Sequence, residues 1–163
     1  MDFASSDNSQ LAKLRRILEQ ESHDSIALLN NVADNPICAI RHDAELPGIF
    51  VEWRNYATSS QLRFVHEYLI HLLEQHNVYK ILGDDSALLT IHSSDQEWIA
   101  LDWMPRAKKA GFRAAAAKRP TGYFGHLAVS NVQAAVSGEI MLRSFSDLND
   151  ARTWLRDIDI SAI

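Results

Sequence analysis

Cysteine and long hydrophobic runs are almost absent from this sequence. Among its 163 residues only Cys38 carries a thiol, which excludes an internal disulfide and a cysteine-rich zinc site. Cys38 lies in the apolar segment 37–40, and we interpret it as a small buried side chain. No apolar stretch approaches the roughly 20 residues of a membrane-spanning helix. Because residues 1–10 are polar and lack the basic cluster of a secretory signal, we expect a cytoplasmic protein without a membrane span.

A surplus of positive charge is also missing. The formal net charge is −5 at pH 7, with 47% hydrophobic and 23% charged residues, as in a single globular domain. The one basic stretch, residues 106–119, contains no acidic residue, but its first cations complement the negative C-terminal end of the helix expected there. No platform of stacking aromatic side chains accompanies it. We therefore expect no nucleic-acid partner.

The motifs of common enzyme classes are absent as well, including phosphate-binding glycine loops, dinucleotide fingerprints and nucleophile elbows. Seven histidines suggest a metal, but His66, His71 and His76 follow one another at about 140° around a helix and cannot converge on one ion. Glu67, His71 and Glu74 share a face opposite the core, which indicates a solvated surface. We expect neither a metal nor a cofactor.

Two adjacent pairs of titratable residues are the candidates for acid–base chemistry. His42–Asp43 and Asp84–Asp85 lie at the ends of predicted strands, and neighbouring carboxylates can have widely separated pKa values. Carboxylates at strand ends are commonly ordinary loop residues. We therefore predict that the protein is not an enzyme.

The residues that are present predict alternating strands and helices, hence an α/β fold with a mainly parallel sheet. Hydrophobic periodicity predicts strands at residues 37–41, 49–53, 78–82, 112–117 and 140–145 and helices at 96–110 and 121–137. Capping residues predict one helix that begins after Thr58 or Ser59 and ends near His76, and another that begins after Ser146 or Asp147. Leucines repeating every 3.5 residues predict one or two further amphipathic helices before Asp34. We divide the chain into an N-terminal helical extension, residues 1–36, and an α/β domain, residues 37–163.

The helix expected at 96–110 is unusually apolar. Trp98 and Trp103 would lie about 140° apart on an α-helix, so both cannot face the same sheet. One of them should line a pocket, a groove or a subunit contact. Pro105 should kink this helix, and Phe64 on the preceding helix is expected to point away from the core. Phe64, Trp98, Trp103 and Pro105 are thus the candidate interface or pocket residues.

The sequence contains a Trp-x4-Trp-x-Pro motif, formed by Trp98, Trp103 and Pro105, and weaker motifs at residues 82–86, 110–112, 124–127 and 141–155. In this order they resemble the motifs of SpoIIAA-like, STAS-related bacterial proteins, and the Trp-x4-Trp-x-Pro motif is the most specific of them. The resemblance covers residues 37–156 and omits the N-terminal extension. It implies a STAS-like fold, with helices stacked on a mainly parallel sheet.

The same resemblance raises the question of a phosphorylated serine. In anti-anti-sigma members of the group, such a serine lies in an Asp-Ser-Ser-Gly-like turn at the start of a helix. The corresponding segment here, residues 91–95, contains Ser94 but no glycine, and Ser86 is a second, looser candidate. From the residues alone, Ser93, Ser94 or Asp95 should cap the following helix.

Three hypotheses for the function follow. The first is a non-catalytic STAS-like interaction module, self-associating as a homodimer, with a further protein partner and a regulatory role. The second is a carrier of a small molecule or lipid, with a pocket under the Trp98–Pro105 helix, and the third is an enzyme of unrecognised type. A dimer without a cavity favours the first, an apolar cavity the second, and two titratable groups converging in a cleft the third.

Overall fold

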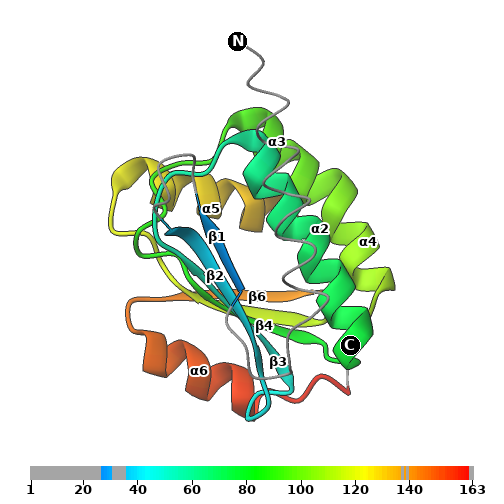
Figure 1. The fold of residues 1–163 in the computed structure, drawn as a ribbon. Helices are drawn as coiled ribbons and strands as arrows, with labels where there is room; N and C mark the ends of the chain where they lie inside the picture. The colour runs from blue at the N-terminus through cyan, green and yellow to red at the C-terminus, as the bar shows by residue number, and fades with distance from the viewer. Residues whose placement is uncertain (1–26, 31–35, 137, 139, 162–163) are drawn as a thin grey trace.

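The fold is an α/β sheet with helices on both faces, seen in the computed structural model in Figure 1, which describes residues 27–30, 36–136, 138 and 140–161. These residues form one six-stranded sheet in the order β1 to β6. β2 pairs antiparallel with both β1 and β3, whereas β3 to β6 are parallel. The strands are β1 (Ala27–Asn30), β2 (Pro36–Asp43), β3 (Gly48–Trp53), β4 (Lys80–Asp84), β5 (Ala114–Lys118) and β6 (Met141–Phe145). The predicted α/β class and mainly parallel sheet are confirmed.

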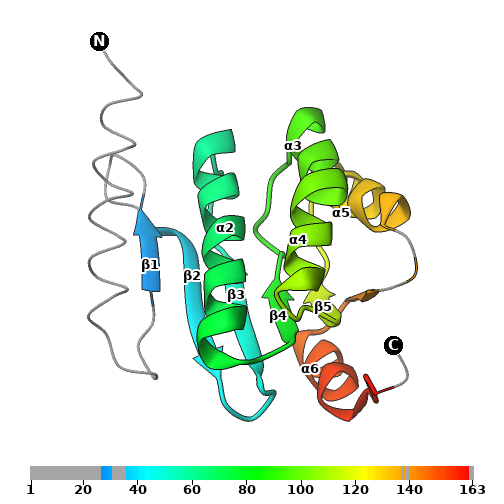
Figure 2. The ribbon, with the colours of Figure 1, turned by 90° about the vertical axis from the view of Figure 1, so that its right-hand side faces the viewer.

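Most of the helices cover one face of the sheet. That face carries α2 (Ser59–His76), a long helix composed of α3 (Ser93–Trp98), η1 (Ile99–Trp103) and α4 (Met104–Lys109), and α5 (Tyr123–Ala135), whereas α6 (Leu148–Asp157) covers the other. Figure 2 shows α2 and α4 side by side over the strands. The larger hydrophobic cluster lies under the first group of helices and the smaller one under α6, as expected for parallel strands buried on both faces.

Local sequence explains where two of these helices begin. The Thr58 hydroxyl accepts a hydrogen bond from the backbone N–H of Gln61, and the Gln61 side chain accepts one from the backbone N–H of Thr58. This reciprocal capping box begins α2. The Asp147 carboxylate accepts hydrogen bonds from two backbone N–H groups in the first turn of α6. Both caps are among those predicted from the sequence.

Phe64 does not point away from the core, so that prediction was wrong. Its side chain is only 9% exposed and belongs to the larger hydrophobic cluster. The ring lies parallel to that of Tyr68, one turn further along α2, at a centroid distance of 6.4 Å. The leucine pattern underestimated the buried arc of α2, which extends beyond a single stripe and includes Gln61 and Phe64.

Residues 27–30 form strand β1, whereas the leucine repeat had placed them in a helix. Ala27 lies opposite Ile40, and Leu29 lies opposite Cys38. The backbone groups of β2 supply hydrogen bonds that a local pattern cannot reveal, and such tertiary pairing overrides helix propensity. The rest of the predicted N-terminal helical extension falls in residues 1–26 and 31–35, outside the described residues.

The long helix over the sheet is not a regular α-helix. It begins at Ser93, three residues before the predicted start, and its middle part η1 is one turn of π-helix. There the backbone N–H of Met104 donates to the carbonyl of Ile99, five residues back. Pro105, which has no N–H to donate, follows directly. The irregularity expected at Pro105 therefore takes the form of a widened turn just before it.

Candidate functional site

A cavity of about 170 Å³ lies between the sheet and the helices of the larger cluster. Strands β3 to β6 form its floor, and α2, η1, α4 and α5 contribute its walls and roof. Its lining is mostly apolar and includes Trp53, Leu69, Ile99, Trp103, Phe112 and Leu142. The cavity thus lies under the helix that the sequence marked as unusually apolar.

Small residues in two neighbouring strands explain why space remains there. Gly83 of β4 and Ala115 and Ala117 of β5 all line the cavity. A Cβ atom placed on Gly83 would lie 3.2 Å from the Cβ of Ala117, so the two residues are close neighbours on the floor. Larger side chains at these positions would fill the volume between the strands and η1.

Four of the lining residues carry amide or ionisable side chains, and two of these are engaged elsewhere. The Gln133 amide nitrogen donates to the hydroxyl of Ser144 at 2.7 Å. The Arg143 guanidinium lies over the rings of Phe145 and Trp154, at 5.1 and 5.8 Å from their centroids. The remaining two are Asp85 and His66.

Asp85 comes directly after β4, at the carboxyl ends of the parallel strands, where open α/β sheets bind ligands. Its carboxyl group lies over Gly83, because a Cβ atom there would meet Oδ1 of Asp85 at 3.3 Å. Neither carboxyl oxygen has a hydrogen-bond or ion-pair partner among residues 27–30, 36–136, 138 and 140–161. Burial, assisted by the charge of Asp84, raises the pKa of Asp85 to about 7.

Asp84 has a different environment, although it is the adjacent residue. Its Oδ1 accepts hydrogen bonds from the backbone N–H and the hydroxyl of Ser86, at 3.0 and 2.5 Å. Consecutive residues of a strand point to opposite faces, so only one member of the predicted acid pair reaches the cavity. The Ser86 hydroxyl, a candidate phosphosite, is engaged in this turn.

His66 of α2 brings an imidazole ring into the cavity lining. Nδ1 lies 2.9 Å from the backbone carbonyl oxygen of Leu62 and donates its hydrogen there, which leaves Nε2 as an acceptor. Three tryptophan rings surround the imidazole, those of Trp53, Trp98 and Trp103, at centroid distances of 6.5, 6.0 and 4.9 Å. Burial lowers the pKa of His66 to about 4, so the ring is neutral near pH 7.

Trp98 and Trp103 therefore contact the same histidine, which the sequence analysis did not expect. The angle predicted between them assumed α-helical geometry, but the π turn places residues five apart closer to one another along the same side. Trp103 is 3% exposed and its indole N–H donates to the backbone carbonyl of His66 at 2.6 Å. Trp98 is half-buried, with the guanidinium groups of Arg63 and Arg106 over its ring at 4.9 and 5.9 Å.

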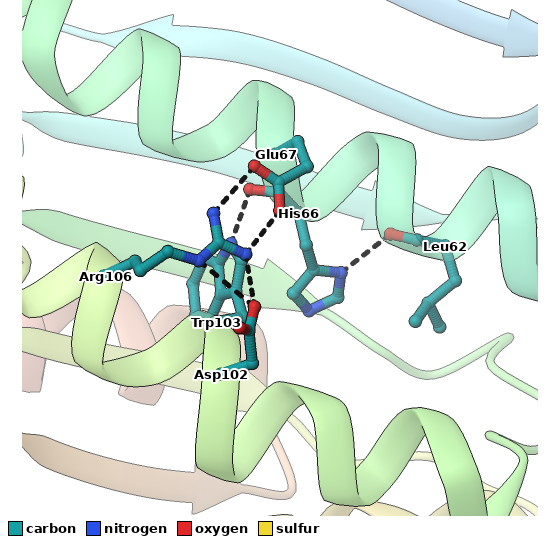
Figure 3. Close-up of polar contacts among 6 residues, drawn as sticks. All are labelled: Leu62, His66, Glu67, Asp102, Trp103 and Arg106. Atoms are coloured by element: carbon teal, nitrogen blue, oxygen red, sulfur yellow. Dashed lines mark hydrogen bonds and ion pairs between the residues drawn. The ribbon is translucent and has the colours of Figure 1, made fainter.

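An ion-pair network holds the roof of the cavity to α2, as Figure 3 shows. Arg106 bonds to Glu67 on α2 at 2.5 Å and to Asp102, four residues back on the same helix, at 2.6 Å. Since all three groups are exposed, each pair contributes about 0–1 kcal/mol. Pro105 is exposed and borders a separate groove between η1, α4 and the end of α5.

Ser94 does not cap the helix, contrary to the prediction. The N-cap of α3 is His92, which makes no side-chain capping bond, and Ser94 is an exposed residue in the first turn. The structure places neither Ser94 nor Ser86 in the cavity lining. Phosphorylation of either serine stays a prediction.

Asp95 is a structural residue that the sequence analysis treated only as a possible cap. It is 2% exposed and accepts hydrogen bonds from the Ser59 hydroxyl and from Nε of Arg63, the latter at 2.8 Å. These contacts join the first turn of α3 to the first turns of α2. Nothing in the local sequence distinguishes this buried carboxylate from a solvent-exposed helix-start residue.

The other residues considered for chemistry have structural surroundings. Burial raises the pKa of the Cys38 thiol far above its ordinary value, as expected for a buried side chain. Asp43 pairs with Arg152 at 2.8 Å, and the His42 ring stacks on that of His76 at 4.4 Å. Within the described residues there is no cluster of three metal-ligating side chains and no helix long and apolar enough to cross a membrane.

Comparison with known proteins gives no functional assignment, so any conclusion on function depends on the geometry of the cavity. A scan against protein-family models gives no match, and searches of the curated proteins and of the solved structures find no similar chain. The SpoIIAA-like, STAS-related assignment therefore stays a proposal based on the motifs in the sequence.

Proposed function

We propose that this protein binds a small, largely apolar molecule in the cavity between the sheet and the helices α2 and η1. The cavity itself, about 170 Å³ lined mainly by apolar side chains, is the observation that carries this proposal. Protein interiors contain few voids larger than a water molecule. An engineered apolar cavity of about 150 Å³ in another protein takes up benzene. The space thus suits a ligand of about one ring and is too small for a long-chain lipid.

The polar groups of the lining favour a ligand site over a packing defect. Asp85 and His66 each present polar atoms that find no partner in the described part of the chain. Both side chains are half-buried and line the cavity, so a ligand placed there could form hydrogen bonds with them. Binding pockets typically combine apolar walls with a few such groups that orient the ligand.

Catalysis is less well supported than binding. A pKa of about 7 would suit Asp85 for proton transfer, and His66 lines the same cavity. However, a pKa of about 4 leaves His66 without a proton to donate from Nε2 near neutral pH. Among the described residues that line the cavity there is no serine, threonine, cysteine or lysine, so none of them offers a hydroxyl, thiol or amine nucleophile.

Self-association as a STAS-like module is a second candidate function, favoured by a different surface. The N-terminal half of α5 exposes Tyr123, Phe124 and Leu127, the first two by 74% and 69%. Exposed apolar side chains that lie together often mark protein contacts, and we propose a second copy of this chain as the partner, since symmetric dimers are the commonest oligomers. Light scattering should give a dimer mass for the native protein and a monomer mass for Phe124→Ser. A native monomer at micromolar concentration would contradict this.

Ligand binding can be tested with toluene as the probe. In calorimetric titrations we expect toluene to bind the native protein and to raise its Tm. Ala117→Leu, which fills the cavity floor, should abolish binding, whereas Ala134→Leu on the exposed side of α5 should bind as the native protein does. Leu69→Phe, which fills the cavity from α2, replaces Ala117→Leu in this experiment if Ala117→Leu does not fold. Absence of toluene binding to folded native protein would overturn the proposal.

A further inference from the structure

The cavity contains a hydrogen-bond acceptor that the fold itself does not use, Nε2 of His66. Nδ1 donates to the Leu62 carbonyl one turn back in α2, which fixes the tautomer and leaves a lone pair on Nε2. Figure 3 shows the ring projecting from α2 toward η1, with its other nitrogen bonded to none of the residues drawn. None of the residues that the structure describes provides a donor for Nε2.

This acceptor is held in a fixed position. The backbone carbonyl of His66 accepts the indole N–H of Trp103, and the indole and imidazole rings pack edge to face with their centroids 4.9 Å apart. Arg106 of α4 binds Glu67, the next residue of α2, and so keeps the two helices together. The imidazole ring of His66 is therefore already oriented before a ligand binds. This reduces the conformational entropy that the side chain loses on binding.

The charge of the lining excludes one class of ligand. Among the described residues that line the cavity, Asp85 carries the one carboxyl group, and the one cation, Arg143, lies over Phe145 and Trp154. An anionic ligand would thus meet Asp85 without a cation to pair with it. A permanent cation would lose its hydration among largely apolar side chains. An uncharged ligand with a hydrogen-bond donor fits both the walls and the acceptor.

Building on the proposed ligand binding, we infer that the ligand is an uncharged molecule of about one aromatic ring whose hydroxyl or N–H group donates a hydrogen bond to Nε2 of His66. The rings of Trp53, Trp103 and Phe112 line the same space and offer edge-to-face contacts to such a ring. The donor would satisfy an acceptor that otherwise has no partner in an apolar setting, which gives the site its selectivity.

Phenol and toluene form a matched pair of probes, since they have nearly the same size and differ in one hydroxyl group. At pH 8 we expect the native protein to bind phenol roughly five- to tenfold more tightly than toluene, the range of one hydrogen bond. His66→Phe should remove the difference while toluene still binds. His71→Phe, at an exposed position of the same helix, should keep it. Benzoate should not bind.

A second measurement does not depend on any variant folding. In ¹⁵N NMR spectra of native protein, phenol should shift the Nε2 resonance of His66 and toluene should not, because only phenol donates to that nitrogen. Equal affinities for the two probes, or a phenol preference that persists in His66→Phe, would overturn the inference while leaving the cavity as a binding site. Tighter binding of benzylamine than of phenol, lost in Asp85→Asn, would also overturn it. Failure of both phenol and toluene to bind would instead contradict the proposed function.

Discussion

Asp85 has an environment very different from that of a carboxyl group in water. Its pKa rises from its ordinary 3.8 to about 7, chiefly because burial disfavours the charged form. Between these two pH values the unfolded chain releases the proton while the native protein keeps it. The contribution of Asp85 to the free energy of unfolding therefore falls as pH rises from about 4 to 7, by at most about 4 kcal/mol. His66, whose pKa is lowered to about 4, contributes in the opposite direction as pH rises from about 4 to 6.5.

Replacing Asp85 by asparagine should remove the Asp85 contribution, and comparison of the two proteins at the same pH cancels that of His66. At pH 8 we expect Asp85→Asn to be more stable than the native protein by about 1–3 kcal/mol, because the amide carries no charge into the cavity. Near pH 4 the two proteins should differ little. Urea unfolding at both pH values measures the difference, with Asp150→Asn, at an exposed position of α6, as the control. Equal stability of the native protein and Asp85→Asn at pH 8 would show that this carboxyl is well solvated.

Thr58 and Ser94 provide a comparison between a capping residue and a serine that only resembles one. Thr58 forms both bonds of a capping box, whereas Ser94 lies inside the first turn of α3 and makes no capping bond. Thr58→Ala should cost about 0.5–2 kcal/mol of stability, and Ser94→Ala should cost less than about 0.5 kcal/mol. Thermal or urea unfolding can rank the two variants. The opposite ranking would restore Ser94 as the cap.

The sequence predicted some of the site residues but not their arrangement. Asp84–Asp85 was identified as an acid–base pair, but strand β4 begins two residues later than expected, and the register decides which carboxyl enters the cavity. His66 was considered only as a metal ligand. Its tautomer depends on the carbonyl four residues back, and its contact with Trp98 depends on a π turn. Such tertiary details leave no periodic signal.

At the scale of elements, polar contacts join α2 to the α3–η1–α4 helix. Besides the bond from the Trp103 indole to the His66 carbonyl, they are the exposed network around Arg106 and buried Asp95, which binds Ser59 and Arg63. A buried carboxylate held by a cation and a hydroxyl is costly to disrupt, because removing it leaves its partners unsatisfied. The buried contact should therefore contribute more to stability than the exposed one.

Asp95→Ala tests this difference directly. We expect it to lower the free energy of unfolding by about 2–4 kcal/mol, compared with less than about 1 kcal/mol for Asp102→Ala. In a double-mutant cycle, Asp95→Ala and Arg63→Ala should together cost less than the sum of their single effects, since they remove the same ion pair. Additive effects, measured by urea unfolding, would mean that the two side chains do not interact.

The π turn η1 contains one residue more than an α-helical turn requires. Leu101 is exposed within it, so deleting Leu101 should restore regular hydrogen bonding and keep α3 and α4 on their present faces. We expect this deletion to fold with a modest loss of Tm. Deletion of exposed His71 from regular α2 should rotate the following turn out of register and cause a much larger loss. Equal losses in thermal unfolding would contradict the interpretation of η1 as a one-residue insertion.

The elements themselves were largely predictable, and the exceptions have physical reasons. Caps at Thr58 and Asp147 are local signals, and alternating strands and helices imply a mainly parallel sheet. The pairing of β1 with β2 depends on backbone hydrogen bonds between the two strands, and the widened turn before Pro105 depends on how the helix packs over the sheet. Neither is encoded in the spacing of apolar residues.

At the scale of the whole molecule, the cavity exists because small side chains of the sheet do not fill the space beneath the helix that covers them. The floor has Gly83, Ala115 and Ala117, while the roof is a helix held by Asp95 and Arg106 at its two ends. The alanine-rich segment 112–117 was predicted as a strand. Whether the helix settles onto such a strand or leaves space above it depends on side chains from four other elements, which the sequence alone does not specify.

The most direct test of the central claim is a crystal structure of the native protein soaked in toluene. We predict density for one toluene molecule between β4, β5 and η1, in contact with Trp103 and Phe112, with little movement of the surrounding backbone. The same crystals without toluene should show the cavity open. A structure in which the lining side chains close the space, or in which ordered water remains there in the presence of toluene, would contradict the account.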